Sequence, residues 1–151
     1  MGHWSIRKDG GPERIPKTLH ILIADDQPSF RHTLREMMQA EPSWSVVAEA
    51  SNGLEAIEQV KRHRPDVVLM DIVMPDMSGI EATRCIKKIA PETKIIAITT
   101  YDDAEFLKQS IEAGADLFIK KEELDISTLR ECLEKLSNPN DQIQIESEGG
   151  S

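Results

Sequence analysis

The fold of this chain is decided by residues 67–79, which read VVLMDIVMPDMSG. The run VVLM is unbroken apolar sequence, which is typical of a parallel strand covered on both faces. Asp71 follows this run directly. At the other end, Ser78 and Glu81 have the spacing of a capping box, which predicts that a helix begins just after Ser78. The stretch is therefore a buried strand, a loop led by an aspartate, and the start of a helix.

The same alternation recurs on both sides of this stretch. Further apolar runs occupy residues 19–24, 46–48, 95–98 and 117–119. Each is followed by apolar residues at helical spacing, such as Phe30 and Leu34. Pro28 suits a first helical turn, and Pro65 and Pro91 are expected to end the second and third helices. Five such units predict an α/β fold with five helices, in which a five-stranded, doubly wound parallel sheet has the flavodoxin-like order 2-1-3-4-5.

In a sheet of this kind the carboxyl ends of the strands form one rim, where ligands bind. The residues at or just after these ends are Asp25, Asp26, Asp71, Thr99, Lys120 and Lys121. Each has an ordinary explanation by itself, since aspartates cap helices and form turns, lysine pairs fill charged loops, and threonine favours strands. Four of the five strands nevertheless end in compatible chemistry, and this predicts a functional rim.

Three carboxylates on one rim need a counter-charge. Two of them about 4 Å apart repel by ~1 kcal/mol in water and by ~4 kcal/mol at an effective dielectric of 20. Mg²⁺ suits such a site, because it accepts a few carboxylates while keeping waters and phosphate oxygens. A carboxylate can also act as a nucleophile and form an aspartyl phosphate. The rim therefore predicts phosphoryl transfer to Asp71, with Asp26 and Asp71 on the metal, Lys121 as the cation and Thr99 as a hydrogen-bond donor.

The sequence resembles the receiver domain of two-component response regulators over residues 18–137. The likeness rests on ILIADD at 21–26, the stretch at 67–79, IIAITT at 95–100 and AGADLFIKK at 113–121. The resemblance implies that Asp71 is phosphorylated and that Asp26 and Asp71 ligate Mg²⁺ directly. It also implies that Asp25 acts largely through water and that Val73 lends its backbone carbonyl to the metal. Thr99 would move toward the phosphoryl group, and Phe118 would be the switch aromatic that turns inward.

The choice between the two lysines depends on the register. The family pattern Ala-Asp-x-aromatic-x-x-Lys, read from Ala115, places Phe118 at the aromatic and Lys121 at the lysine. Strand alternation also puts residues 119 and 121 on one face and Lys120 on the other. Glu122 stands where the family often has proline, and Phe118 replaces the more usual tyrosine. The missing proline and the run TTYDD resemble the subfamily usually joined to a helix-turn-helix output domain.

The resemblance implies a switch rather than an enzyme with an external substrate. A sensor histidine kinase would phosphorylate Asp71 in a magnesium-dependent reaction. The face made by the fourth helix, fifth strand and fifth helix would then change, and it would signal to a partner or form a homodimer. Transcription would be regulated through an output domain that is absent from this chain.

Several alternatives remain open at this stage. A stand-alone receiver would act by docking to proteins, and a degenerate receiver would serve only as a scaffold. A magnesium-dependent aspartyl-phosphate hydrolase usually has Asp-x-Asp at its first strand and a capping insertion, whereas this chain has Asp25-Asp26 and short connections. A flavin module needs a phosphate loop after the first strand, where this chain has acidic residues instead.

Composition sets further limits on function. The chain has 151 residues, enough for one domain, with 39% hydrophobic and 30% charged residues and a net charge of -9. This charge argues against direct nucleic-acid binding, which depends on basic residues.

No apolar run is long enough to span a membrane and the start is not a signal peptide, so we expect a cytoplasmic protein whose Cys85 and Cys132 are reduced. Residues 1–17 are expected to be a flexible lead-in, and residues 138–151 a disordered tail or truncated linker.

Overall fold

The computed structural model describes residues 18–100 and 104–137. The predictions for residues 1–17 and 138–151 lie outside these described residues. In chain order the elements are β1 (Leu19–Ala24), α1 (Pro28–Met38), β2 (Trp44–Ala50), α2 (Gly53–His63), β3 (Val67–Asp71), α3 (Gly79–Ile89), β4 (Lys94–Thr99), α4 (Ala104–Ala113), β5 (Leu117–Lys120), the 3-10 turn η1 (Lys121–Glu123) and α5 (Ile126–Ser137).

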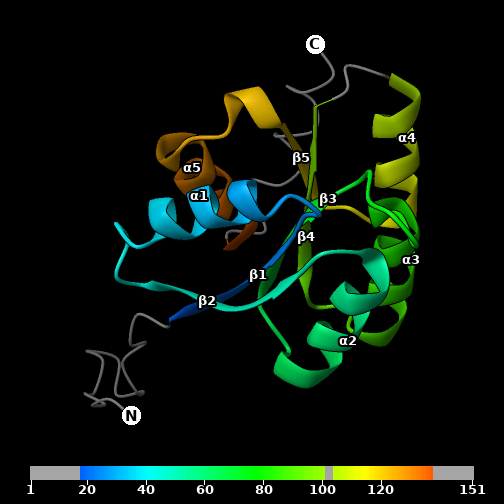
Figure 1. The fold of residues 1–151 in the computed structure, drawn as a ribbon, viewed down its shortest axis with the longest axis horizontal. Coiled ribbons are helices and arrows are strands. Elements are labelled where there is room, and N and C mark those ends of the chain that lie inside the picture. The colour runs from blue at the N-terminus through cyan, green and yellow to red at the C-terminus, as the bar shows by residue number, and fades with distance from the viewer. Residues whose placement is uncertain (1–17, 101–103, 138–151) are drawn as a thin grey trace, which may run out of the picture.

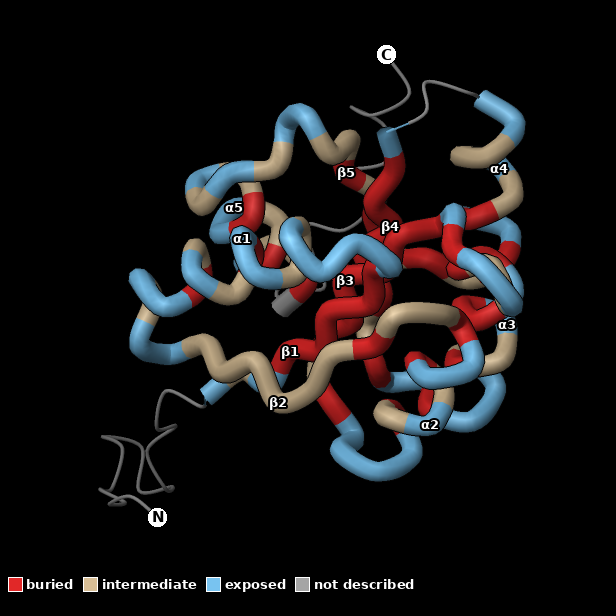
Figure 2. The backbone as a smooth tube through the Cα atoms, viewed as in Figure 1, coloured by how far each residue is buried: buried red, intermediate tan, exposed pale blue. Residues whose placement is uncertain are grey.

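The five strands form one parallel sheet in the order β2-β1-β3-β4-β5, as predicted. Helices α1 and α5 cover one face, and α2, α3 and α4 cover the other (Figure 1). Each face has its own buried hydrophobic cluster. The buried backbone is concentrated in β1, β3, β4 and β5, between the two helical layers (Figure 2). β3 has all five residues buried, which explains its unbroken apolar sequence.

The helix starts use the side chains that the sequence indicated. Pro28 occupies the first turn of α1. Ser78 caps α3 by accepting a hydrogen bond from the Glu81 backbone N–H at 3.2 Å, and Asn52 caps α2 in the same way at 2.8 Å from Glu55. α2 and α3 end at residues 63 and 89, before the two prolines predicted to stop them. These caps set where each loop at the carboxyl rim gives way to helix.

Four strands extend beyond the predicted apolar runs: β3 and β5 by one residue each, β4 by two and β2 by four. β2 extends over Trp44–Ala50 instead of residues 46–48, because this edge strand includes polar residues that break its apolar run. β5 continues to Lys120, after which the chain turns into η1. Lys121 therefore belongs to a 3-10 turn, and the strand alternation used to choose this lysine does not apply to it.

An ion pair joins three elements at the amino edge of the sheet. Lys87 Nζ in α3 lies 3.1 Å from Asp116 Oδ2, just before β5. The same ammonium donates to the carbonyls of Thr93 at 2.8 Å and Pro91 at 3.2 Å. Asp116 Oδ2 also accepts from the Ile95 backbone N–H at 2.8 Å. This network ties the end of α3 to the starts of β4 and β5.

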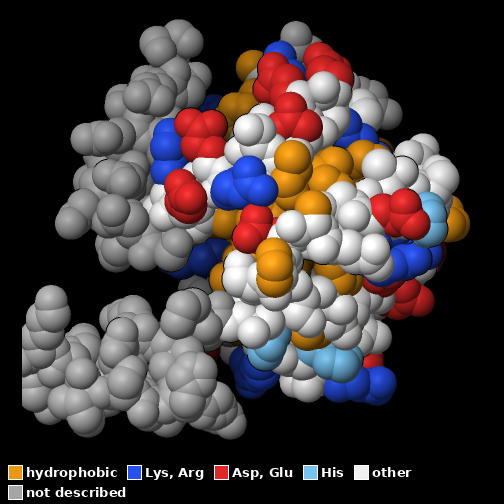
Figure 3. Space-filling view, turned by 90° about the vertical axis from the view of Figure 1, so that its left-hand side faces the viewer, with side chains coloured by type: hydrophobic (Ala, Val, Ile, Leu, Met, Phe, Trp, Pro, Cys, Tyr) orange, Lys and Arg blue, Asp and Glu red, His pale blue; other side chains and the backbone are white. Residues whose placement is uncertain are grey.

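The described helices and one face of the surface bear on membrane and nucleic-acid contacts. None of the helices in this part of the chain has the length and apolarity needed to cross a membrane. Acidic and basic side chains are interspersed on the face shown in Figure 3, which is the left-hand side of Figure 1. On that face, charge does not gather into a basic patch of the kind that binds phosphate backbones.

Candidate functional site

Three carboxylates meet at the carboxyl edge of the sheet. Asp25 and Asp26 follow β1, and Asp71 is the last residue of β3, the strand next to it. One ligand atom from each of the three lies within 4.8 Å of the others, which makes them a possible metal-binding group. Asp25 and Asp71 are 1% and 7% exposed, whereas Asp26 is exposed. An acidic pocket of this composition is typical of Mg²⁺ sites.

The loop after Asp71 is held by close backbone packing. The Val73 backbone N–H donates to Asp71 Oδ1 at 3.1 Å, and the Gly79 N–H donates to the Ile72 carbonyl at 3.2 Å. A Cβ atom on Gly79 would lie 2.0 Å from the Asp71 carbonyl oxygen, so only glycine fits there. On the far side of the loop, Gly53 of α2 donates to the Met77 carbonyl at 3.0 Å. The backbone that carries Asp71 is therefore fixed from two sides.

Lys121 supplies a cation to this acidic group. Its Nζ lies 2.9 Å from Asp25 Oδ2 and 3.8 Å from Asp71 Oδ2, and its side chain is 12% exposed. The contact with Asp25 Oδ2 is an ion pair without hydrogen-bond geometry, and this buried oxygen has no hydrogen-bond partner among the described residues. Asp25 Oδ1 accepts from the Gln27 backbone N–H at 2.8 Å. Of the two candidate lysines, Lys121 forms ion pairs with the carboxylates of Asp25 and Asp71.

The electrostatics of the site raise the pKa of Asp71 to about 7. Burial of the carboxylate is the main cause, and repulsion from Asp25 acts in the same direction. The hydrogen bond from Val73 and the positive charge of Lys121 oppose this rise without cancelling it. Without a further cation, Asp71 is thus divided between its charged and neutral forms near neutral pH.

The other predicted residues lie at or near the same edge. Thr99 is buried at the end of β4, and β4 pairs with β3 so that Ile98 is opposite Asp71. Val73 is 39% exposed in the loop after β3. Phe118 in β5 is half-buried and packs against the cluster beneath α2, α3 and α4. The metal, catalytic and switching roles of these residues stay predictions.

Three residues of α1 and its N-cap were missed by sequence reasoning. Gln27 and Phe30 contact Lys121, with Gln27 Oε1 at 3.4 Å from Nζ and the Phe30 ring centroid at 4.2 Å. Arg31 Nη1 donates to the Asp25 carbonyl at 2.6 Å. Lys121 lies 94 residues after Gln27, so no local pattern could have indicated these contacts.

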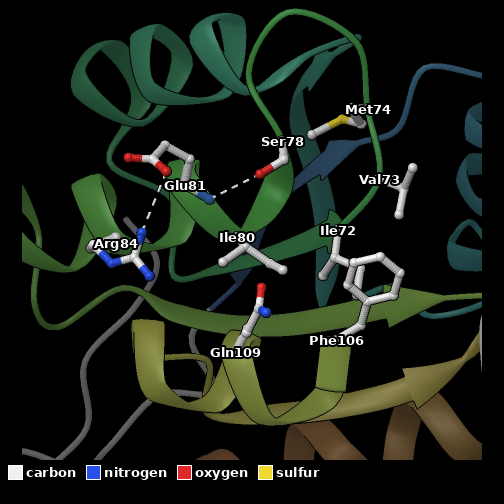
Figure 4. A pocket seen from close by; sticks show the side chains of 9 residues that line it. All are labelled: Ile72, Val73, Met74, Ser78, Ile80, Glu81, Arg84, Phe106 and Gln109. Carbon is white, nitrogen blue, oxygen red and sulfur yellow. Dashed lines mark hydrogen bonds and ion pairs between the residues drawn. The ribbon is translucent and has the colours of Figure 1, made fainter. Parts of the chain in front are cut away.

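A separate cavity of about 310 Å³ opens beside the acceptor loop, between α3 and α4. Figure 4 shows the Phe106 and Gln109 side chains projecting from α4 toward Ile72 and Ile80. Val73 lines this cavity as well, whereas the three clustered aspartates and Lys121 do not. The helix α4 is therefore not tightly packed against the loop that follows Asp71.

The family of the chain follows from a comparison of its sequence with known families. Residues 21–134 match the response regulator receiver domain. This chain belongs to that family. The match covers the last four residues of β1, all of β2 to β5, and both segments that carry the acidic residues.

Relatives of this receiver domain include chains about twice as long as the match and chains that the match covers almost entirely. It is 35% identical over 115 residues to the transcriptional regulatory protein DegU of Brevibacillus brevis, covering 76% of this chain and 48% of DegU. A DNA-binding response regulator of the LuxR family from Staphylococcus aureus superimposes with a TM-score of 0.74 at 28% identity, covering 80% of this chain and 99% of that chain. CheY in the CheX-CheY-BeF3-Mg complex of Borrelia burgdorferi gives a TM-score of 0.70 at 27% identity, covering 83% and 90%.

The likeness to DegU and to the LuxR family regulator confirms the predicted resemblance to receivers that are joined to a helix-turn-helix output domain. The chain spans about half the length of the first curated relatives that it matches.

Proposed function

We propose that this receiver domain is a magnesium-dependent phosphorylation switch with Asp71 as the acceptor. The observation that carries the proposal is the meeting of three carboxylates and one ammonium at the carboxyl edge of the sheet. The donors fit a hard divalent cation, because they are carboxylate oxygens close together and one buried oxygen of Asp25 has no hydrogen-bond partner within the described residues. When bound, Mg²⁺ would supply the positive charge that keeps Asp71 ionised and balances the phosphoryl oxygens.

The chain's own residues would carry the transfer. A carboxylate oxygen of Asp71 attacks the phosphorus of a phosphohistidine on a partner sensor kinase. The new O–P bond forms as the P–N bond breaks, and the imidazole leaves with the electron pair and takes up a proton. Lys121, 3.8 Å from Asp71 Oδ2, is close enough to contact the phosphoryl oxygens, and the Thr99 hydroxyl at the end of β4 donates to one of them. The group then stays on Asp71, so the domain is a switch and not an enzyme that turns over an external substrate.

The test is labelling by a small phosphodonor. With acetyl phosphate and Mg²⁺, intact mass spectrometry should show one added phosphoryl group per wild-type chain and none on Asp71→Asn. Chelation of Mg²⁺ should abolish labelling, and Asp26→Asn should strongly reduce it. Asp76→Asn is the matched control, because Asp76 lies in the same loop, is exposed and has a φ of 66°, which asparagine tolerates.

Two results would contradict this function. Full labelling of Asp71→Asn would show that another residue is the acceptor. Steady hydrolysis of a generic phosphate ester would favour the aspartyl-phosphate hydrolase instead.

The signal would leave through the face made by α4, β5 and α5. The cavity between α3 and α4 gives α4 room to shift, and the half-buried Phe118 in β5 lies against the same cluster. Light scattering with and without beryllofluoride and Mg²⁺ tests whether this face forms a homodimer on activation. An unchanged mass would leave docking to another protein as the output.

Regulation of transcription would come from an output domain outside this chain, acting in the cytoplasm. The likeness to DegU supports this, since this receiver matches 48% of that regulator. A stand-alone receiver is the second candidate, supported by a match that covers 90% of the CheY chain. An antibody against this domain, used on lysate of the source cell, separates the two. A band well above 17.0 kDa favours the output domain, and a band near 17.0 kDa favours the stand-alone receiver.

A further inference from the structure

The ammonium of Lys121 has an aromatic neighbour in addition to its carboxylates. Nζ lies 4.2 Å from the centroid of the Phe30 ring. At distances below about 6 Å a ring face attracts a cation through its quadrupole. Asp25 Oδ2 at 2.9 Å, Gln27 Oε1 at 3.4 Å and Asp71 Oδ2 at 3.8 Å also lie near the ammonium. The Phe30 ring is therefore part of the immediate surroundings of the cation.

The Phe30 ring is held in place by the first turn of α1. The Gln27 carbonyl accepts from the backbone N–H groups of Phe30 and Arg31, both at 3.1 Å. The Arg31 guanidinium ties this turn to the end of β1 through the Asp25 carbonyl at 2.6 Å, and to β2 through Glu49 at 2.9 Å. The ring also packs against the hydrophobic cluster beneath α1 and α5. Phe30 thus belongs to a braced segment and is fixed independently of Lys121.

We propose that Phe30 is a positioning residue whose ring face holds the Lys121 ammonium beside Asp71 before phosphoryl transfer. This inference rests on the proposed function of Asp71 as the acceptor. Lysine has a long side chain with many rotamers. In a rotamer that points the ammonium away from Asp71, the side chain has to rotate back before the transition state can form. A fixed ring face favours the rotamers that stay and restricts the side chain, which is 12% exposed, to the acidic group.

The geometry also explains why the ring can position the Lys121 ammonium without competing with the phosphoryl group for it. Ring and carboxylates contact the ammonium together, so the cation need not leave Phe30 to approach Asp71. The ring bears no formal charge, whereas the phosphoryl group is anionic and attracts the ammonium more strongly. Phe30 therefore positions the cation and leaves its charge available for the transfer.

The sharpest test weakens the ring quadrupole at nearly constant shape. Phe30 is replaced site-specifically by phenylalanine with one, two or three ring fluorines, which withdraw electron density from the ring face. The initial rate of Asp71 labelling by acetyl phosphate and Mg²⁺ should fall stepwise, by about two- to tenfold across the series. The rate of Phe30→Leu should be reduced by a factor in the same range. Phe30→Tyr should be labelled at close to the wild-type rate, because it keeps an aromatic face.

The same fluorine series in a Lys121→Ala variant distinguishes the effect of the Lys121 contact from general effects of Phe30 on the fold. In Lys121→Ala, the fluorine series should leave the residual labelling rate unchanged, because the partner of the ring is gone. In the unphosphorylated wild type, the Lys121 ε-CH₂ protons should resonate upfield from the ring current, and Phe30→Leu should abolish that shift. The proton shift tests the contact itself, whereas a purely structural role of Phe30 does not predict a fluorine effect on the rate that depends on Lys121.

Each outcome decides the matter. A wild type labelled on Asp71 with a flat fluorine series, or with rates that rise along it, overturns the role of Phe30 and leaves the proposed function standing. A wild type that is not labelled at all removes both proposals. A stepwise fall that vanishes in Lys121→Ala supports both.

Discussion

Two lysine–aspartate clusters lie at opposite edges of the same sheet. At the amino edge, Lys87 meets one carboxylate, Asp116, and two backbone carbonyls, and the same carboxylate oxygen of Asp116 also accepts a backbone N–H. At the carboxyl edge, Lys121 meets Asp25 and Asp71, and Asp26 completes a group of three carboxylates. One cluster is balanced in charge, and the other has an excess of negative charge.

The difference lies in how far the charges of each cluster balance. Both clusters use the same residue types, with one lysine bridging elements far apart in the chain. In the balanced cluster the charges satisfy one another and join α3, β4 and β5. In the unbalanced cluster the pKa of Asp71 is raised to about 7, because burial and Asp25 oppose its ionisation more than Lys121 favours it. Among the described residues, the second edge is where three carboxylates lie close enough together to hold an additional cation.

The largest expected effect comes from Gly79, beside the carboxyl-edge cluster, and Gly114 beside the amino-edge cluster is its comparison. Gly79→Ala should destabilise the protein by about 3 kcal/mol or more, because its Cβ would lie 2.0 Å from the backbone oxygen of Asp71. Gly114→Ala should cost about 1–2 kcal/mol, since φ is +117° there but the nearest atom, at 2.7 Å, is a side-chain carbon of Lys87 and not a backbone atom. Urea denaturation measures the loss in the free energy of unfolding for both variants. A larger loss in Gly114→Ala than in Gly79→Ala would show that the loop after Asp71 can shift to accommodate the added Cβ.

The next effect breaks the balanced cluster. Lys87→Met keeps the aliphatic stem and removes the ammonium, so that Asp116 loses its counter-charge and two carbonyls lose this donor. We expect a loss of about 2 kcal/mol in the free energy of unfolding, because the pair is largely buried. Folded Lys87→Met should still be labelled by acetyl phosphate at the wild-type rate. A large drop in that rate would mean that the two edges are coupled.

A gain in stability is expected from the unbalanced cluster. Asp71 has a folded-state pKa of about 7 against an ordinary value of 3.8, so folded protein loses stability as pH rises through this window. Asp71→Asn should therefore stabilise the metal-free protein by about 1–2 kcal/mol at pH 8, after allowance for solvent screening. The gain should shrink steadily toward pH 4. Denaturation at a series of pH values in a chelator tests this, and a gain independent of pH would point to packing instead of charge.

The smallest effect is expected at an exposed ion pair between Arg130 and Glu41, which serves as a reference for the buried pair. Arg130 in α5 binds Glu41 through two nitrogens at 3.0 and 3.1 Å, and the Arg130 side chain is 46% exposed. Arg130→Ala should change the free energy of unfolding by only about 0.5 kcal/mol. If its loss equalled that of Lys87→Met, burial and charge balance would not explain the strength of the amino-edge pair.

Much of the fold could be predicted because its signals are local. The apolar run of β3 is followed directly by Asp71, and the caps at Ser78 and Asn52 mark where helices begin. The strand order followed from the number of units and the handedness of their connections. The edge strand β2 was predicted too short, because an edge strand is less uniformly buried and carries polar residues that interrupt its apolar run.

Contacts between distant segments were less predictable. The meeting of Asp25, Asp26, Asp71 and Lys121 followed from the strand order, because strand ends of a parallel sheet share an edge. The Phe30 ring over Lys121 depends on the angle at which α1 leaves the rim, and no sequence spacing encodes that angle. The partnership of Lys87 with Asp116 across 29 positions was likewise not foreseen, since each side chain alone resembles an ordinary surface charge.

The raised pKa of Asp71 also bears on how this sequence is maintained. Asparagine has nearly the same shape and could keep the bond from Val73 if its carbonyl oxygen replaced Asp71 Oδ1, while avoiding the charge that burial disfavours. Selection for stability alone would therefore favour asparagine at this position, one base change away in the genetic code. A lineage that keeps the acid is under selection for something other than folding. On the proposed function, the carboxylate at this position is kept for its chemistry at a cost in stability.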